Sequence, residues 1–294
     1  MKGKIMKALS GFYYVADGDN IVTCKPRGRF RRQGDVPVVG DEVEYSLSGA
    51  QPTQGTLEKI LPRKNCLIRP AVANLDALVI LVSGAIPVTE PFLIDRMTVI
   101  AERQNILPIL CVNKTDLDPA RELLEIYRGV GYPVVSTSAA TGEGIEALQK
   151  LIAGKTVAFT GNSGVGKSAV LSRLCPSLTL QTGEVSEKLG RGRHTTRHIE
   201  LFSVGSGTLA ADTPGFSSFD LEMMDRIPKQ ELAELFPEFR QYIGCCRFQD
   251  CSHRSEPDCA VLAALRDGKI SPSRHQSYRK LYELSEQMKS WEIP

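Results

Sequence analysis

The chain has 294 residues, of which 24% are charged and 42% hydrophobic, and its formal net charge at pH 7 is +2. This composition is typical of soluble globular proteins, and the length suits two domains or three small ones. The sequence has neither the apolar core of a secretory signal nor an apolar run long enough to span a membrane, so we expect a cytoplasmic protein with no membrane partner.

The N-terminal region, residues 1–66, has the features of a small all-β domain. The stretch "GFYYVADGDNIVTC" (11–24) contains two short β-rich runs separated by Asp-Gly-Asp-Asn, which is typical of a hairpin. Further short runs follow, with Gly and Pro between them. This pattern predicts a small barrel of the OB or SH3 type.

Basic residues are concentrated in the same region. Residues 1–34 carry eight Lys or Arg against two Asp, an excess of six. The excess fits a polyanionic partner such as RNA, and it fits a solvated basic edge strand equally well. If the partner is RNA, we expect mainly phosphate contacts from Lys25, Arg27, Arg29, Arg31 and Arg32.

Residues 67–222 alternate between apolar runs and amphipathic stretches. The runs "DALVILVSG" (76–84) and "ILPILCVN" (106–113) are typical of buried parallel strands. Residues 91–105 and 120–131 have helical spacing. The alternation predicts an α/β domain with a mostly parallel sheet.

The octapeptide "GNSGVGKS" (161–168) fits the phosphate-loop pattern G-x-x-x-x-G-K-[ST]. Its glycines allow backbone N–H groups to curve around phosphates, and the helix that follows directs its positive end at the anion. We expect Lys167 at the β and γ phosphates and the Ser168 hydroxyl on Mg²⁺. The expected phosphate-binding set is Gly161, Asn162, Ser163, Gly164, Val165, Gly166, Lys167, Ser168 and Ala169.

A second phosphate motif is "DTPG", which ends a predicted strand in "TLAADTPGF" (208–216). Asp212 is expected to hold Mg²⁺ through water, and the Gly215 N–H is expected to contact the γ-phosphate. The motif alone is a common turn, but its place 44 residues after Ser168 strengthens the nucleotide interpretation.

The choice of base is predicted by "NKTD" (113–116) and "TSAATGEG" (137–144). A carboxylate at Asp116 accepts hydrogen bonds from the guanine N1–H and N2–H₂ edge, which adenine lacks. Asn113 would meet the O6/N7 side, and the stem of Lys114 would cover the ring. "NKTD" alone is also compatible with an ordinary strand-to-helix loop. Together the two motifs favour GTP, with a base-binding set of Asn113, Lys114, Thr115, Asp116, Ser138 and Ala139.

The base motifs precede the phosphate loop, which is the reverse of the usual order. Both sets follow strands of one predicted sheet, and a sheet tolerates new termini where the old ones lie close together. We therefore predict a circularly permuted G domain. In this order the segment after "DTPG" continues directly into the C-terminal region, and a γ-phosphate-dependent movement there could act on that region.

Residues 223–294 are predicted to be helical and to carry a metal site. Three thiolates and one imidazole would make a closed, structural zinc site. A pair of disulfides with an incidental His is the alternative. The sequence offers five candidate ligands for four positions: Cys245, Cys246, Cys251, His253 and Cys259.

The barrel, the permuted G domain and the cysteine cluster together resemble the RsgA (YjeQ/YloQ) family of bacterial GTPases that depend on the small ribosomal subunit. The resemblance covers nearly the whole chain and rests on "NKTDL", "TSAATGEG", "GNSGVGKS", "GRGRHTTRH", "DTPGF" and "CRFQDCSHRSEPDC". It implies an OB-fold barrel (1–66), a circularly permuted P-loop GTPase domain (67–222) and a zinc-binding helical domain (223–294).

The resemblance also implies a role in late maturation of the small (30S) ribosomal subunit, contact with its 16S rRNA, and GTP hydrolysis to GDP stimulated by that subunit. We expect a monomer. A pure RNA-binding module with a vestigial GTP site is the first competing hypothesis, and every nucleotide motif being filled argues against it. The second is a P-loop enzyme of RNA modification or small-molecule phosphoryl transfer, but the sequence has no motif for an acceptor pocket.

Further site residues are carried over from the family. The stretch "LGRGRHTTRHIEL" (189–201) lies where the first switch belongs, and of its two threonines the resemblance favours Thr196 over Thr195 for Mg²⁺. It also implies that His194 orients the attacking water, because Phe216 cannot; an RNA-contacting or loop-shaping role is the alternative. For one structural Zn²⁺ it selects Cys246, Cys251, His253 and Cys259, which leaves Cys245 spare.

Overall fold

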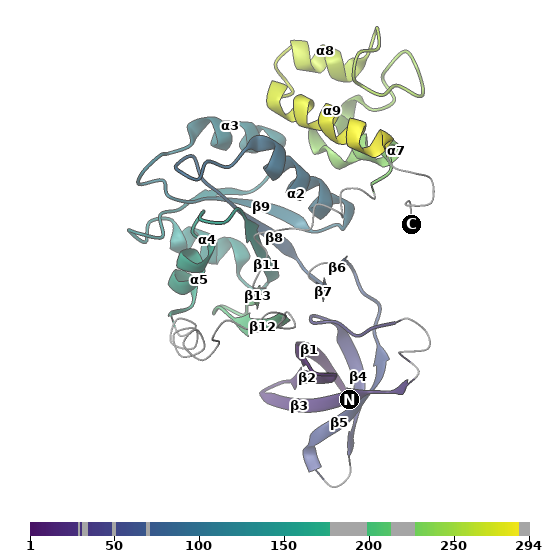
Figure 1. Ribbon diagram of the computed structural model, residues 1–294, viewed down its shortest axis with the longest axis vertical. Helices are drawn as coiled ribbons and strands as arrows, with labels where there is room; N and C mark the ends of the chain where they lie inside the picture. The colour runs from purple at the N-terminus through teal and green to yellow at the C-terminus, as the bar shows by residue number, and fades with distance from the viewer. Residues whose placement is uncertain are drawn as a thin grey trace.

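The structure is a computed structural model that describes residues 1–28, 30, 35–48, 51–68, 71–176, 199–212 and 227–287. Figure 1 shows three parts along the long axis: a strand-rich part that carries the N-terminus, a central α/β part, and a helical part that ends the described chain. This arrangement confirms the predicted fold class. Among the described residues, every helix is too short or too polar to span a membrane.

The N-terminal part is a five-stranded barrel. Its strands are β1 (Lys2–Leu9), β2 (Phe12–Asp17), β3 (Asn20–Pro26), β4 (Glu42–Ser48) and β5 (Gln51–Ile60). They follow the order β1-β2-β3-β5-β4, and the pairing of β4 with β1 closes the barrel. Alternate side chains point inward and are fully buried, as at Ile5, Val15 and Val43. The five strands match the OB type of small barrel.

The central part alternates strands and helices, as expected. Its elements are β8 (Ala77–Val82), α2 (Pro91–Arg103), β9 (Leu107–Val112), α3 (Arg121–Val130), β10 (Val134–Ser136), α4 (Ile145–Ile152), β11 (Thr156–Gly161), α5 (Lys167–Leu174), β12 (Ile199–Ser203) and β13 (Leu209–Asp212). The strand order is β10-β9-β8-β11-β13-β12, and all neighbours are parallel except the β12–β13 pair.

Helices cover both faces of this sheet, which explains why its central strands are continuously apolar. On β8, Leu78 and Ile80 face a core that includes Ile94 of α2, whereas Val79 and Leu81 belong to the core on the opposite face. That second core contains residues of α4 and α5. All six residues of β8 are buried.

The topology accounts for the reversed motif order. Strands β9 and β10, which precede the two base motifs, lie in the same sheet as β11, which leads into the phosphate loop. Because these strands are parallel, their carboxyl ends meet at one edge of the sheet. The motifs therefore converge there whichever one the chain reaches first.

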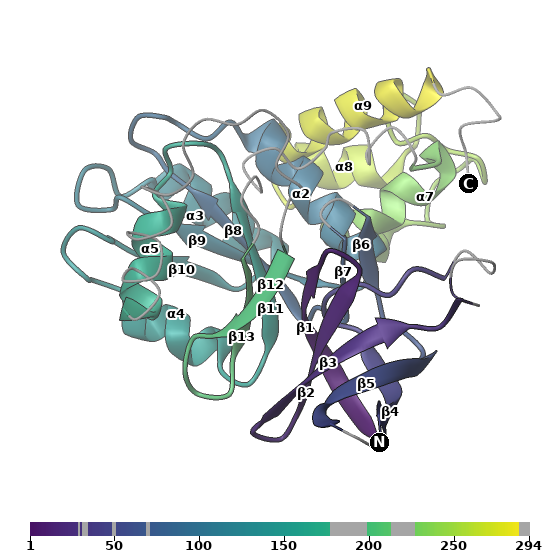
Figure 2. The same ribbon diagram turned by 60° about the horizontal axis from the view of Figure 1, so that its bottom comes forward.

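The barrel and the α/β sheet are joined through backbone pairing. Strand β1 pairs antiparallel with β12, and both strands are labelled in Figure 2. In this pair Lys7 lies opposite Glu200 and Ala8 opposite Ile199. The side chains of Lys7 and Glu200 form an ion pair of 2.7 Å. One continuous sheet of eleven strands results. A short hairpin, β6 (Cys66–Ile68) and β7 (Ala71–Ala73), lies between the two parts along the chain.

The C-terminal part packs against α2. Its elements are α7 (Lys229–Leu232), η2 (Ala233–Leu235), η3 (Pro237–Tyr242), α8 (Ala260–Arg266) and α9 (Pro272–Glu286). Figures 1 and 2 both place α9 beside α2. Its core is aromatic: Phe236, Phe239 and Tyr278 are buried and their rings lie 5.0–5.4 Å apart between centroids.

Candidate nucleotide-binding and metal sites

The phosphate loop connects β11 to α5, as its motif requires. Gly161 and Gly166 have φ angles of 140° and 96°, which favour glycine. A Cβ at Gly161 would lie 2.2 Å from the Leu81 carbonyl oxygen, and one at Gly166 would lie 2.4 Å from Nδ2 of Asn113. The backbone of the loop can therefore take this path only with glycine at both positions.

Lys167 lies inside the loop that it follows. Its Nζ donates hydrogen bonds to the carbonyl oxygens of Gly161, at 2.6 Å, and Asn162, at 3.0 Å. The side chain is half-buried, and this burial lowers the pKa of its ammonium group. The positive charge of Lys167 is thus held inside the loop, at the place where the loop would surround the phosphate oxygens of a nucleotide. Of the other loop residues, Ser163, Gly164, Ser168 and Ala169 are exposed and Val165 is buried.

Asn113 ties the base motif to the phosphate loop. Its side chain is almost completely buried at the end of β9. Nδ2 donates to the carbonyl oxygen of Val165 at 2.8 Å, and Oδ1 accepts a hydrogen bond from the Ala139 N–H at 3.0 Å. The structure therefore assigns Asn113 a connecting role between three loops. Its expected contact with the guanine O6/N7 side stays a prediction.

The three residues that follow Asn113 differ in their hydrogen bonds and exposure. Lys114 has a φ of 63°, and its Nζ donates to the Ile86 carbonyl oxygen at 2.8 Å. The Thr115 hydroxyl donates to the Thr137 carbonyl oxygen at 3.0 Å. Asp116 is exposed. An exposed carboxylate that directly follows two anchored residues could meet the polar edge of a base.

The loop of residues 137–144 closes on itself beside Asn113. The Ser138 N–H donates to the Glu143 carbonyl oxygen at 3.0 Å, and the Gly142 N–H donates to the Ser138 carbonyl oxygen at 2.7 Å. Gly144 has a φ of 73°, and a Cβ there would lie 1.9 Å from the Ser136 carbonyl oxygen. These bonds fix the backbone at Ser138 and Ala139, the two residues expected to reach the guanine oxygen.

Several expected site residues lie at or beyond the edge of the described chain. Asp212 ends β13, with its backbone in register with Glu200. Gly215, His194, Thr195, Thr196 and Phe216 lie outside the described residues, as do Arg29, Arg31 and Arg32. Their expected roles stay predictions.

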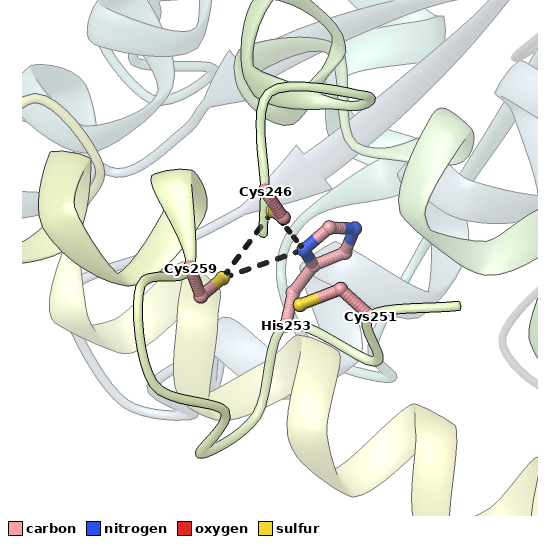
Figure 3. Close-up of side chains that lie close together, drawn as sticks. All are labelled: Cys246, Cys251, His253 and Cys259. Carbon is pink, nitrogen blue, oxygen red and sulfur yellow. Dashed lines mark hydrogen bonds between the residues drawn. The ribbon is translucent and has the colours of Figure 1, made fainter. Parts of the chain in front are cut away.

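The metal-ligand cluster consists of Cys246, Cys251, His253 and Cys259, whose ligand atoms all lie within 4.8 Å of one another. Figure 3 shows the four side chains converging from loop segments and the start of α8. The Sγ atoms of Cys246 and Cys259 are 3.8 Å apart, and each lies 3.5 Å from Nδ1 of His253. A tetrahedral zinc site with Zn–S bonds of about 2.3 Å has ligand separations of about 3.8 Å, so the cluster fits this ion.

The cluster selects the same four ligands that the family resemblance implied. Cys245 is exposed and is not among them. All eight cysteines are free thiols, so the alternative of two disulfides is not found. Burial raises the pKa of the Cys251 thiol to about 12 and lowers the pKa of His253. Zinc binding would therefore displace protons from the thiols and meet an imidazole that is already neutral.

Two side chains outside the ligand set support the cluster. The carboxylate of Glu256 accepts hydrogen bonds from the N–H groups of Ser252, Arg254 and Ser255 at 2.8–3.0 Å. Burial alone raises the pKa of Glu256, but hydrogen bonds from the Ser252 hydroxyl and from backbone N–H groups outweigh it and lower the pKa to about 2. His275 on α9 holds the backbone oxygen of His253 through Nε2 at 2.8 Å. No sequence signal pointed to Glu256, since an acidic residue in a polar loop is common.

Two family models match this chain. Residues 60–222 match the model of the RsgA GTPase family, and residues 2–56 match the model of the RsgA N-terminal domain. This chain belongs to the RsgA GTPase family. It is thereby a GTP-hydrolysing enzyme, and the prediction of a P-loop GTPase domain is confirmed.

Curated RsgA relatives are similar over nearly their full length. The Small ribosomal subunit biogenesis GTPase RsgA of Alkaliphilus metalliredigens is 44% identical over 283 residues, which cover 95% of this chain and 96% of the relative. The protein of the same name from Bacillus anthracis is 44% identical over 288 residues, which cover 96% of each chain.

Solved RsgA-type structures have the same fold. The crystal structure of YjeQ from Thermotoga maritima superposes with a TM-score of 0.83 at 35% identity, covering 98% of this chain and 99% of that one. YloQ, described as a circularly permuted GTPase, superposes with a TM-score of 0.79 at 36% identity, covering 98% and 96%. The predicted circular permutation is confirmed.

Proposed function

We propose that this RsgA-family GTPase acts in late maturation of the small (30S) ribosomal subunit, binds its 16S rRNA, and hydrolyses GTP faster in its presence. The support is the likeness over nearly the whole chain to relatives named as small ribosomal subunit biogenesis GTPases. The proposal includes the domain boundaries at residues 66 and 222, a monomeric state and a cytoplasmic location.

The proposed nucleotide site uses the two sets of motifs that meet at one edge of the sheet. The single observation that carries it is the hydrogen bond from Asn113 to Val165, which places the base motif against the phosphate loop. Lys167 and the loop N–H groups would stabilise negative charge on the β and γ phosphates as it develops in the transition state. Asp116 would read the guanine edge.

Magnesium and the attacking water are assigned to residues after the phosphate loop. We propose Ser168, Thr196 and Asp212 as the groups that hold Mg²⁺, the ion that neutralises phosphate charge in this chemistry. His194 would orient the water, and the Gly215 N–H would contact the γ-phosphate. Structural Zn²⁺ would be held by the four-residue cluster, whose donor set and spacing fit it.

The proposed RNA contact is supported at the described end of the basic stretch. Nζ of Lys25 lies 5.1 Å from the ring centroid of Phe12, and Phe12 is exposed. An exposed aromatic ring beside a cation is suited to an unpaired base and its phosphate. Arg27 forms an ion pair of 2.8 Å with Glu58, so part of its charge is already matched. Lys25 is therefore the stronger candidate of the two.

The test is GTP turnover by the purified chain with and without isolated small subunits. ATP and large subunits are the controls. We expect strong stimulation by the small subunit alone, and loss of turnover in Lys167→Ala. Unchanged turnover in Lys167→Ala would overturn the phosphate-site assignment. A flat response to every ribosomal particle, with GTP turnover intact, would overturn the ribosomal part of the proposal.

A further inference from the structure

Arg173 makes a two-pronged contact between the phosphate-loop helix and the base loop. It lies near the end of α5, and its Nε donates to the Ala139 carbonyl oxygen at 2.8 Å. Its Nη2 donates to the next carbonyl oxygen, that of Ala140, at 2.7 Å. The guanidinium group presents its donors in a fixed planar fork, so it can hold two successive carbonyls in one orientation.

The base loop is held on a second side by Asn113. The Ala139 N–H donates to Oδ1 of Asn113 at 3.0 Å, while Arg173 holds the carbonyl of the same residue. One anchor comes from β9 and the other from α5, so the loop is fixed between the base strand and the phosphate helix. The relative position of the two halves of the nucleotide site thus depends on both anchors.

The contact also sets the direction of one backbone donor. A trans peptide is planar, with its C=O and N–H pointing in opposite directions. Because Arg173 holds the Ala139 C=O, the Ala140 N–H in the same peptide points away from Arg173. The hydrogen bonds found among the described residues include none from this N–H, and Ala140 is exposed. It is an oriented donor available to a ligand.

Guanine carries a carbonyl acceptor, O6, where adenine carries an amino donor. We propose that Arg173 is a positioning residue for guanine recognition: it holds the 139–140 backbone so that the Ala140 N–H can donate to O6, while the Ala139 N–H stays bonded to Oδ1 of Asn113. The proposal rests on the base-site assignment made above. It adds a backbone donor at O6, an atom outside the N1–H and N2–H₂ edge that Asp116 is proposed to read.

The test compares three nucleotides that differ at single positions of the base. GDP has both recognition edges, IDP lacks the N2 amine, and 6-thio-GDP replaces O6 with sulfur, a weaker acceptor. Affinities are measured by calorimetry for the unaltered chain, Arg173→Ala, Arg173→Lys and the control Arg128→Ala. Arg128 is an exposed arginine on α3 of the same domain. Thermal unfolding of each variant reports its folding.

For Arg173→Ala we expect GDP affinity to fall about tenfold and the preference for GDP over 6-thio-GDP to shrink toward one. The preference for GDP over IDP should stay as in the unaltered chain, because it reports Asp116. A lysine can hold only one carbonyl, so the GDP affinity and the 6-thio-GDP preference of Arg173→Lys should lie between those of the unaltered chain and Arg173→Ala. Arg128→Ala should change none of these values. If Arg173→Ala does not fold, the 6-thio-GDP preference of Arg173→Lys decides the question.

Two results would overturn the proposal while leaving the base site intact. One is equal weakening of GDP, IDP and 6-thio-GDP in both Arg173 variants, which indicates a general structural role. The other is unchanged affinity for all three. Failure of the unaltered chain to bind GDP would be a different result, because it would overturn the base-site assignment and this proposal with it.

Discussion

The guanidinium of Arg274 on α9 contacts the carboxylate of Asp95 on α2 at 2.7 Å, and neither side chain is exposed. Arg274 also holds both carboxylate oxygens of Glu238, at 2.7 and 3.0 Å. Burial alone lowers the pKa of Arg274, but the charges of Asp95 and Glu238 outweigh it and raise the pKa well above its ordinary value. A permanently charged arginine therefore links the C-terminal part to helix α2 of the GTPase domain.

We predict that Arg274→Ala destabilises the protein by about 3–5 kcal/mol, because it leaves two buried carboxylates without a counter-charge. Urea unfolding checks this. Arg240→Ala is the matched control, since Arg240 also forms an ion pair with a carboxylate of α2, that of Glu102, at 2.6 Å, but from an exposed position. This substitution should destabilise the protein by at most about 1 kcal/mol. Equal losses in the two variants would contradict the prediction.

Glu256 gives a second prediction, for zinc retention. Replacing it with Gln removes the charge that three backbone N–H groups share, and this should loosen the loop that carries Cys251 and His253. We expect zinc transfer to a chromogenic chelator to become about ten times faster, as is usual for groups that support metal ligands. The exposed Asp250→Asn is the control. The same transfer rate in both variants would show that Glu256 does not support the site.

Asp116 gives a third prediction, on base choice. Asp116→Asn should weaken GDP binding by about 10- to 150-fold, because a charged acceptor of two hydrogen bonds is replaced by an amide that also donates. Xanthine carries an oxygen at C2 where guanine carries the amine, so XDP binding should strengthen in the variant. Competition against a fluorescent nucleotide measures both. A parallel loss of GDP and XDP binding would place Asp116 away from the base.

Asp76 gives a prediction for pH. Its Oδ2 accepts the Thr156 N–H at 2.7 Å at the start of β11, and Lys64 forms an ion pair with it. Burial alone raises the pKa of Asp76, but the bonds from Lys64 and Thr156 outweigh it and lower the pKa. The carboxylate thus adds stability that is fully present above the ordinary Asp value of about 3.9 and is lost as the pH falls through the lowered folded value.

It follows that the gap in unfolding free energy between the unaltered chain and Asp76→Asn should be largest near neutral pH. The gap should shrink steadily as the pH falls from 5 toward 3. Urea unfolding at a series of pH values follows it. A gap that stays constant over this range would mean that the carboxylate contributes by its shape and hydrogen bond alone, and not by its charge.

Most of the fold and the outline of the site could be predicted from local patterns in the sequence. The alternation of strands and helices, the phosphate loop and the base motifs are patterns of neighbouring residues, and the structure places them as expected. The contacts between distant parts of the chain had no such signal. The partners Arg274 and Asp95 are 179 positions apart, and Arg173 contacts backbone carbonyls, which no side-chain pattern reveals.

The metal site could be predicted from the sequence in part. The residues alone reduced the ligands to five candidates, the family resemblance pointed to four of them, and the placement of side chains brings those same four together without Cys245. Asn113 was expected at the base, and its buried bonds to Val165 and Ala139 became visible only when β9 and β11 were placed in one sheet. The pairing of β1 with β12 had no signal either, because any exposed strand edge offers the same backbone groups.

That pairing has a consequence for orientation. Strand β1 is bonded to β2 and β4 within the barrel and to β12 outside it, so the barrel cannot turn against the sheet without breaking backbone hydrogen bonds. The barrel and the sheet therefore turn together as long as β1 and β12 stay paired, so a surface that binds the barrel also sets the direction of the sheet edge that carries the phosphate loop. The barrel is joined to the sheet at β12, and β12 begins directly after residues 177–198, where the first switch is expected.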